Sequence, residues 1–418
     1  MRAPQPVSRL AVALDLPAER VPVGTLAWAE DKRLSAFQYD PAFLARGLAL
    51  SPFRLPAGQG VHWAPPAPFE GLHGVFADSL PDGWGRLLVD RHMAALGHSP
   101  AKLSPLDRLA LVGTRGMGAL CYLPERTLAG PVQPADLDWF ARQARAIEGG
   151  QSGSVEALLR ANGGSAGARP KILVLRHSET GAIRPDYGQK PAPREEAWLV
   201  KLPSRLDPKD AGRVEYAYAL MAAAAGIVVP PVLLLPGTAG QAYFAVRRFD
   251  RFPRAHVHTL AGLVHADFRT PSLDYDDLLK VTSALTRDVG QVQETFRRMV
   301  FNVLVGNRDD HAKNHAFTMA DDGRWSLTPA YDLTLSGGPG GQHNLTVAGE
   351  GRAPGPAQFA QVAQRASLSR AMAIRMTELV RAGLATWPQA AAAAGLSRRR
   401  TGMIGTMLKR GSDNGERS

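Results

Sequence analysis

Three polar side chains in the C-terminal half have types and a spacing that suit phosphoryl transfer. Asp309 lies in the segment FNVLVGNRDDHAKNHAF, Asn314 follows it by five residues, and Asp332 follows it by 23 residues in LTPAYDL. Phosphoryl transfer needs one carboxylate that orients or deprotonates the attacking hydroxyl group. It also needs an amide oxygen and a second carboxylate that hold Mg²⁺ against the β- and γ-phosphates. An aspartate, an asparagine five residues later and a further aspartate about 20 residues on is the arrangement that protein kinases use.

Taken alone, this spacing also fits simpler structures. Asp309 and Asp310 would fit a solvated loop, and Asn314 would fit a helix cap. His311 and His315 are four residues apart and would share one helix face, which is a geometry for zinc. The glutamate of the metalloprotease motif is missing, however, and the one cysteine of the chain offers no second ligand pair.

A glycine-rich segment, GGSAGARPK (163–171), precedes the apolar run ILVL (172–175). Glycines with one serine, followed by a basic residue and a strand, suit a loop whose backbone N–H groups face phosphate. The segment is neither a Walker A motif nor the glycine-rich loop of ordinary kinases, and a plain glycine turn is the alternative interpretation.

Lys201 lies inside the apolar segment LVKLP (199–203), which we predict to be a buried strand. A buried lysine is costly unless it is paired or functional, although a lysine that snorkels from an edge strand is the alternative. In a kinase such a lysine holds the α- and β-phosphates and pairs with a helix glutamate, for which Glu215 is the candidate. The segment VRRFDR (246–251) then stands where a kinase has its adenine-binding hinge.

The order of these features strengthens each of them. Along the chain come a phosphate loop, a strand lysine, a helix glutamate, a hinge strand, a catalytic aspartate and two metal ligands, which is the order in a kinase. Three of only nine lysines, Lys171, Lys201 and Lys313, fall inside these segments.

The elements that must position these residues follow from the hydrophobic pattern. We expect a β-hairpin at 23–39, helices near 80–97 and 104–113, and a mostly helical chain from residue 250 onward. Between 163 and 249 the pattern predicts a glycine loop, a strand, a hairpin, a strand, a helix and two more strands. We therefore predict an α+β protein with three parts: an N-terminal module over 1–125, a nucleotide-binding lobe over 126–250 and a helical catalytic lobe over 251–418.

Composition excludes several other classes. The 418 residues are 45% hydrophobic and 21% charged, which rules out disordered and fibrous chains. One cysteine, Cys121, rules out an intrachain disulfide and a four-cysteine zinc module. Residues 1–16 lack the apolar core of a signal peptide, and the uncharged run 216–236 is broken by Gly226 and two prolines. We expect a cytoplasmic protein without a membrane span.

The charge indicates an anionic partner. Lys and Arg number 49 against 38 acidic residues, a formal net charge of +11. This excess favours a nucleotide, a nucleic acid or an acidic protein surface. Arg398 to Arg400, with Lys409 and Arg410, would make sequence-independent contacts to DNA phosphates, or would simply form a solvated basic end.

Over most of its length the chain resembles the HipA toxin kinases of bacterial toxin–antitoxin systems. LPDGWGRLLVDR (80–91) and LVGTRGMGALCYLP (111–124) are similar to the N-terminal module of that family. The segments that resemble its kinase core are GARPK, LVKLP, VEYAYALMAAAAGI, VRRFDR, GNRDDHAKN and LTPAYDL. The resemblance implies a two-lobed protein-kinase-like fold of the phosphatidylinositol-kinase branch, with ATP and Mg²⁺ as cofactors.

The resemblance also implies partners. It implies a serine/threonine protein kinase that phosphorylates an aminoacyl-tRNA synthetase or another translation protein and so arrests growth. It further implies a HipB-like helix-turn-helix antitoxin and contact with operator DNA through the complex.

Site roles are carried over residue by residue. The resemblance implies that Asp309 is catalytic and that Asn314 and Asp332 bind the metal. The residues implied to line ATP are Gly164, Ser165, Ala166, Gly167, Ala168, Arg169, Pro170, Lys171, Lys201, Glu215, Arg247, Arg248, Phe249, His311, Lys313 and Tyr331.

Two positions depart from the family pattern. Gly164 stands in register with the family's autophosphorylated serine, and Ser165 follows one residue later. Arg247 stands in the hinge where an acidic residue is familiar, although hinge contacts use backbone groups.

Two other functions share these motifs. A small-molecule phosphotransferase would use the same nucleotide site with a closed acceptor pocket. A DNA-associated co-repressor with vestigial kinase activity would use the basic surface, although the intact set Lys201, Asp309, Asn314 and Asp332 argues against a dead kinase.

Overall fold

The computed structural model describes residues 6–126, 135–151 and 153–414. The first sheet along the chain lies in its N-terminal part. This antiparallel sheet has the order β4-β3-β2-β1-β5, and its helices follow β3 and β4 in the chain. Its elements are β1 (Arg9–Asp15), β2 (Arg20–Ala29), β3 (Leu34–Tyr39), α1 (Pro41–Leu44), β4 (Val61–Trp63), α2 (Gly74–Ala77), α3 (Gly83–Ala95), η1 (Pro100–Lys102), α4 (Pro105–Val112) and β5 (Leu120–Leu123). The predicted hairpin is present as β2 and β3.

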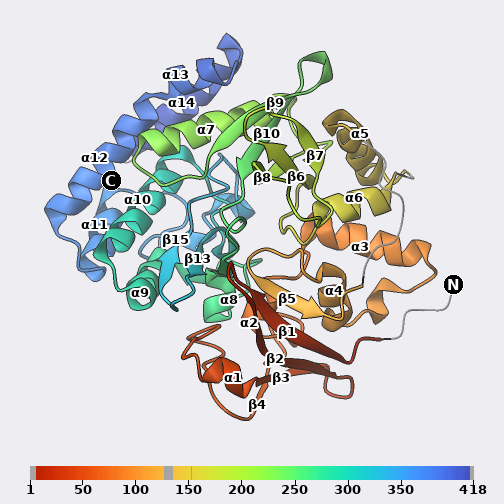
Figure 1. The fold of residues 1–418 in the computed structure, drawn as a ribbon. Helices are drawn as coiled ribbons and strands as arrows, with labels where there is room; N and C mark the ends of the chain where they lie inside the picture. The colour runs from red at the N-terminus through yellow and green to blue at the C-terminus, as the bar shows by residue number, and fades with distance from the viewer. Residues whose placement is uncertain (1–5, 127–134, 152, 415–418) are drawn as a thin grey trace.

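A second antiparallel sheet, in the order β7-β6-β8-β10-β9, carries the predicted phosphate loop and Lys201. Figure 1 shows α5 and α6 on one side of this sheet and α7 on the other. Its elements are α5 (Leu137–Glu148), α6 (Val155–Asn162), β6 (Lys171–His177), β7 (Ile183–Pro185), β8 (Glu195–Lys201), α7 (Ala211–Ala224), β9 (Val232–Pro236), η2 (Thr238–Gly240) and β10 (Ala242–Arg247). The strand and helix order predicted for 163–249 is present.

The C-terminal part is mostly helical, as predicted, and also contains short strands that the hydrophobic pattern did not indicate. Strands β11, β13 and β14 form a three-stranded antiparallel sheet, and β12 and β15 form a parallel pair. The elements are β11 (His256–Thr259), α8 (Leu260–Val264), β12 (Leu273–Asp274), α9 (Tyr275–Thr286), α10 (Val289–Val305), η3 (Ala312–Asn314), β13 (Ala316–Met319), β14 (Trp325–Leu327), η4 (Pro339–Gly341), β15 (Leu345–Thr346), α11 (Pro356–Arg365), α12 (Arg370–Ala385), α13 (Trp387–Ala393) and α14 (Arg398–Asn414).

Two helices connect the parts through the hydrophobic core. Trp84 and Leu88 of α3 lie in the same buried cluster as Phe140 of α5 and Trp198 of β8, so the N-terminal module packs under the second sheet. Helix α7 instead packs on the C-terminal helices, where the Tyr218 ring meets that of Trp387 with the centroids 5.8 Å apart. Elements from the three parts of the chain therefore pack against one another in shared hydrophobic clusters.

A buried hydrogen-bonded chain joins the N-terminal module to β11. His258 Nδ1 lies 2.6 Å from Asp78 Oδ2, and its Nε2 lies 2.9 Å from Ser51 Oγ. The three side chains have the order of a hydrolase triad, but they are 0–5% exposed and hence closed to a substrate. Asp78 also accepts from the Thr259 N–H and hydroxyl, at 2.7 and 2.6 Å. The cluster is a structural junction between the two parts.

Three buried histidines should make stability depend on pH. Burial lowers the pKa of His73, His256 and His315 to about 4. Because these pKa values lie below the unfolded-state value near 6.5, the unfolded chain binds more protons and stability falls as the pH drops below that value. We expect the free energy of unfolding to fall by roughly 1 kcal/mol per histidine between pH 6.5 and 5.5.

Urea unfolding at these two pH values measures this loss. The Leu50 carbonyl oxygen lies 3.0 Å from His256 Nε2, and His256→Gln keeps a group that can donate to it. This variant should lose about a third less of its free energy of unfolding between the two pH values. An unchanged loss of the free energy of unfolding in this variant would contradict the assignment.

Among the described residues, no helix is long and apolar enough to cross a membrane.

Candidate functional site

The predicted phosphate loop runs from α6 to β6 and exposes backbone donors. Gly163 and Gly167 have φ angles of +56° and +104°, which explains the glycines at these positions. Among the described residues, the N–H groups of Ala166, Ala168 and Arg169 find no hydrogen-bond acceptor. Unpaired backbone donors that lie close together in one loop are the chemistry of an anion-binding loop.

The first part of the loop lies against the N-terminal module. Gly164 pairs with Gly116 in a parallel bridge, and a β-carbon at 164 would stand 2.7 Å from the Gly116 Cα. A serine therefore has no room at this position without a shift of the backbone. The hydroxyl of Ser165 donates to the Asn162 carbonyl oxygen at 2.8 Å and stays bound to its own loop.

Two lysines face each other where the loop enters the sheet. Lys171 of β6 and Lys201 of β8 are directly opposite in the antiparallel register, and Lys171 is 6% exposed. Lys171 Nζ donates to the Ala166 carbonyl oxygen, which turns the ammonium group back under the loop. Burial lowers the pKa of Lys171, and the nearby Lys201 adds to this effect. Both lysines therefore stand where the loop enters the sheet.

Lys201 has the carboxylate partner that the sequence predicts. Its Nζ donates to Glu215 of α7 and also to Asp332. Burial would lower the pKa of Lys201, but these two carboxylates raise it above the usual lysine value. Burial raises the pKa of Glu215, against the opposing effect of Lys201. The ion pair joins the second sheet, α7 and the C-terminal part.

The adjacent aspartates 309 and 310 have different environments. Helix α10 ends at Gly306, whose φ of +72° turns the chain into the DDHAKN segment. Asp310 is fully buried and accepts from the Tyr275 hydroxyl, His343 Nδ1 and the Asn344 N–H, each at 2.9 Å. Asp309 is exposed, and its nearest side-chain donor is Asn344 Nδ2 at 3.5 Å. Asp310 therefore anchors the loop, and Asp309 is free to meet a substrate.

The charge around Asp309 suits a proton acceptor. Although Asp309 is exposed, the surrounding protein removes part of the hydration of its carboxyl and so raises its pKa. The negative charges of Asp332 and Asp310 add to this effect, while His311 opposes it. A raised pKa makes a carboxylate a better base near neutral pH.

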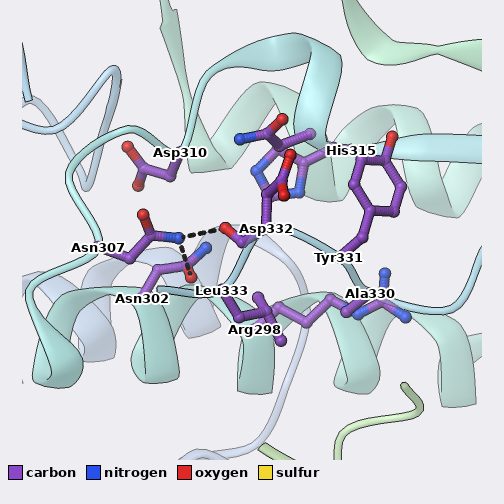
Figure 2. A pocket seen from close by; sticks show the side chains of 10 residues that line it. Arg298, Asn302, Asn307, Asp310, His315, Ala330, Tyr331, Asp332 and Leu333 are labelled. Atoms are coloured by element: carbon purple, nitrogen blue, oxygen red, sulfur yellow. Dashed lines mark hydrogen bonds between the residues drawn. The ribbon is translucent and has the colours of Figure 1, made fainter. Parts of the chain in front are cut away.

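Asp332 is held in an uncommon backbone conformation. Its φ is +53°, in the left-handed region that aspartate tolerates better than most residues. Figure 2 shows Asn307 between Asn302 and Asp332, with its Nδ2 donating to the Asn302 Oδ1 at 3.0 Å and the Asp332 carbonyl oxygen at 2.9 Å. Burial would raise the pKa of Asp332, but Lys201 and Lys171 hold it well below its usual range. Asp332 therefore stays ionised.

Asn314 and Asp332 fit a magnesium ion as a donor set. Asn314 Nδ2 donates to the Asp309 carbonyl oxygen at 2.8 Å, which leaves its amide oxygen available. Among the described residues, no group of three or more His, Cys, Asp or Glu could hold a metal by itself. Mg²⁺ commonly takes one or two carboxylates and completes its shell with phosphate oxygens and water, so this sparse set suits a nucleotide-bound ion. His315 is buried beside the Tyr275 ring and does not form an exposed pair with His311.

The predicted hinge provides an aromatic wall. Phe249 stacks on Tyr331 with the ring centroids 6.0 Å apart, and the Tyr331 hydroxyl donates to the Lys313 carbonyl oxygen at 2.8 Å. A cavity beside this wall is lined by Lys201, Val232, Val246, Tyr331 and Asp332. Its lining combines apolar side chains with the charged side chains of Lys201 and Asp332.

The two hinge arginines have other partners. Arg247 pairs with Glu196 at 2.9 Å. The guanidinium of Arg248 lies 2.7 Å from Asp250 and also donates to the Gly116 carbonyl oxygen at 3.4 Å. The Arg247 side chain thus forms an ion pair at the surface, and that of Arg248 contacts the N-terminal module. Arg169, at the end of the predicted phosphate loop, pairs with Asp207 at 3.3 Å.

Several residues of the site carried no sequence signal that we used. Asn302, Asn307 and Asp310 support Asp332 and the loop that carries Asp309, and all three lie within the segment 301–317. Asp82 of the N-terminal module reaches both the phosphate loop and Lys313. The neighbouring turn residues of the LPDGWG motif were the available signal for Asp82.

Comparisons with known families match two segments. Residues 163–387 match the HipA-like C-terminal domain, and residues 14–123 match the HipA N-terminal domain. Two similar proteins of Sinorhizobium fredii are named "Putative kinase Y4dM" and "Putative kinase Y4mE". The first is 33% identical over 154 residues, which cover 33% of this chain and 37% of the relative. The second is 31% identical over 300 residues, which cover 62% of this chain and 63% of the relative. The chain thus matches less than two thirds of the length of either protein.

A solved structure shares the fold. A chain of the Shewanella oneidensis MR-1 toxin–antitoxin complex of HipA, HipB and operator DNA superposes with a TM-score of 0.69, over 98% of this chain and 97% of that chain. The sequences are 18% identical, so this likeness establishes the α+β fold.

Proposed function

Because this chain belongs to the HipA family, we propose that it is an ATP-dependent serine/threonine protein kinase and the toxin of a toxin–antitoxin pair. The observation that carries the proposal is the convergence of Lys201, Glu215 and Asp332 beside a loop with free N–H groups, with Asp309 exposed at the edge. We further propose the two-lobed kinase arrangement of the phosphatidylinositol-kinase branch, with parts at 1–125, 126–250 and 251–418.

In this proposal each residue has a separate task. Mg²⁺ bound with ATP supplies charge neutralisation at the β- and γ-phosphates. Asn314 and Asp332 would hold the ion through oxygen atoms, and Lys171 and Lys201 would meet the phosphates. Asp309 would accept the proton of the attacking hydroxyl group and orient its oxygen toward the γ-phosphate.

A protein acceptor is favoured by the position of Asp309. Its carboxylate is exposed, whereas its neighbour Asp310 is buried, so the acceptor approaches an open edge of the site. An aminoacyl-tRNA synthetase or another translation protein remains the proposed target. A small-molecule phosphotransferase would instead enclose its acceptor.

The basic C-terminal helix supports a proposed contact with operator DNA through a HipB-like antitoxin. Arg398 and Arg399 of α14 are exposed, while Arg400 pairs with Asp210 at 3.2 Å. The side chain of Arg410 lies outside the described residues. Of the side chains that the structure describes in this cluster, those of Arg398 and Arg399 are the arginines open to phosphates, as the co-repressor role would require.

Induced expression in bacteria tests the function directly. Phosphoproteomics should find serine or threonine sites that gain phosphate with the unaltered chain and not with Asp309→Asn, because only the former keeps the proposed base. The purified candidate target should then be phosphorylated in vitro with Mg-ATP. Phosphate transfer to a metabolite but to no protein would favour the small-molecule phosphotransferase. ATP binding without any transfer would favour the co-repressor.

A further inference from the structure

Asp82 brings a third part of the chain into the nucleotide site. It stands at the start of α3 in the N-terminal module, far in sequence from both lobes. One carboxylate oxygen accepts from the backbone N–H of Gly167 in the phosphate loop, and the other accepts from Lys313 Nζ at 2.7 Å. A single side chain therefore ties the loop to the turn that follows Asp309.

Asp82 does not do what its position in the helix would suggest. Aspartate at a helix N-cap usually accepts from a backbone N–H in the first turn of its own helix. Here the cap residue makes no side-chain hydrogen bond to α3. Its carboxylate is directed away from its own helix and toward the loop, so the contact with Gly167 replaces a capping interaction.

The residues next to Asp82 hold the same part of the loop. The Trp84 N–H donates to the Gly167 carbonyl oxygen at 3.2 Å. A β-carbon at Gly83 would stand 2.6 Å from the Ala168 Cα, so the two backbones touch. Together with the Gly116–Gly164 bridge, these contacts attach both ends of the loop to the N-terminal module.

Asp82 anchors the loop without filling it. It takes the N–H of Gly167, whereas the N–H groups of Ala166, Ala168 and Arg169 have no acceptor among the described residues. A carboxylate that merely imitated a phosphate would be expected to take several of these donors. The free donors remain available for the nucleotide.

The partner lysine depends on Asp82 for its orientation. Lys313 is 10% exposed as a side chain, and its Nζ lies 4.3 Å from the centre of the Phe268 ring. Burial would raise the pKa of Asp82, but Lys313 lowers it, which keeps the carboxylate ionised. A lysine stem has four rotatable bonds, so the pair removes most of its freedom before a ligand arrives.

We propose that Asp82 is a positioning residue of the nucleotide site, which holds the phosphate loop and Lys313 in the arrangement that receives the phosphates of ATP. The inference rests on the proposed nucleotide-binding function and adds the N-terminal module as a part of that site. It acts through Gly167 and Lys313 and touches no reacting atom.

The first test is Asp82→Asn, which keeps the shape and removes the charge. We expect the KM and Kd for Mg-ATP to rise about 10-fold, because a charge-assisted hydrogen bond is lost. The value of kcat should stay within roughly two-fold, because the chemical groups are untouched. Glu70→Gln is the matched control: this carboxylate belongs to the same module and pairs with Arg86 at the surface, 43% exposed. It should leave both constants unchanged.

Two further measurements separate positioning from a general loss of structure. In the Lys313→Met background, Asp82→Asn should add little to the increase in KM, because the partner is already gone. Hydrogen exchange of residues 164–170 in the nucleotide-free protein should be faster in Asp82→Asn and unchanged in Glu70→Gln. Any of three results would overturn the inference. The first is ATP binding by Asp82→Asn that is equal to or tighter than that of the unaltered chain. The others are a full additional 10-fold rise in KM when Asp82→Asn is added to Lys313→Met, and unchanged hydrogen exchange of residues 164–170 in Asp82→Asn.

The exchange measurement also separates this inference from the proposed function. If the unaltered chain failed to bind ATP, the proposed function would be wrong. The anchoring of the loop by Asp82 would still be tested, because the hydrogen exchange of residues 164–170 is compared between variants without any nucleotide.

Discussion

Asp309→Asn should lower the rate of phosphate transfer by about 1,000-fold or more and leave the affinity for Mg-ATP within two-fold, since a positioned general base contributes a factor of this order. The asparagine has the size of the aspartate but cannot accept the proton of the attacking hydroxyl. Asp309 is exposed and has one weak side-chain contact, Asn344 Nδ2 at 3.5 Å, so the change should not disturb the fold. Single-turnover transfer and calorimetric ATP titration measure the two quantities.

Two other aspartates provide the controls. Asp322→Asn alters an exposed carboxylate in a turn, paired with Arg324, and should change neither rate nor affinity. Asp310→Asn alters a fully buried anchor with three donors and should lower stability and activity together. If Asp309→Asn transferred phosphate at the unaltered rate, the catalytic assignment would be wrong.

The sequence was sufficient for the parts of the site that lie within short motifs. The pairing of Lys201 with Glu215 follows from a lysine in an apolar strand and a glutamate at the start of the next helix, 14 residues later. The strands and the helix between 163 and 249 follow from their apolar runs and glycine turns. Local patterns of this kind are set by burial, which composition and periodicity reveal.

Contacts between distant segments could not be read in this way. Asp82 and Lys313 are 231 residues apart, and nothing in either local pattern indicates the other. The roles of Asp309 and Asp310 differ because Tyr275, His343 and Asn344 fold around only one of them. The side chain of Arg248 lies where Asp250 and the Gly116 carbonyl oxygen hold it, and no local pattern around Arg248 indicates the contact with the N-terminal module. Strands β11, β13 and β14 are three or four residues long, too short for a period of two to stand out.

Lys201→Met should weaken Mg-ATP binding by about 100-fold, because it removes the cation from a partly buried cluster of charges. The ammonium lies between Glu215 and Asp332, and both carboxylates would remain after the change. Their mutual repulsion would no longer be balanced, and a nucleotide triphosphate would then meet two negative charges with one lysine fewer. Stability should fall as well, since the remaining carboxylates lose their counter-ion.

Affinity and stability can be separated by a second change on the same pair. Glu215→Gln leaves Lys201 its contact with Asp332, and in the Lys201→Met background it removes one of the two unbalanced carboxylates. The double variant should therefore be more stable than Lys201→Met alone, while its ATP affinity stays low. Lys190→Met, at an exposed lysine of the same lobe, is the control and should match the unaltered chain in calorimetry and thermal unfolding. Near-normal ATP affinity in the double variant would mean that Lys201 balances the two carboxylates without contacting the phosphates. Of the two lysines proposed to contact the phosphates, only Lys171 would then remain.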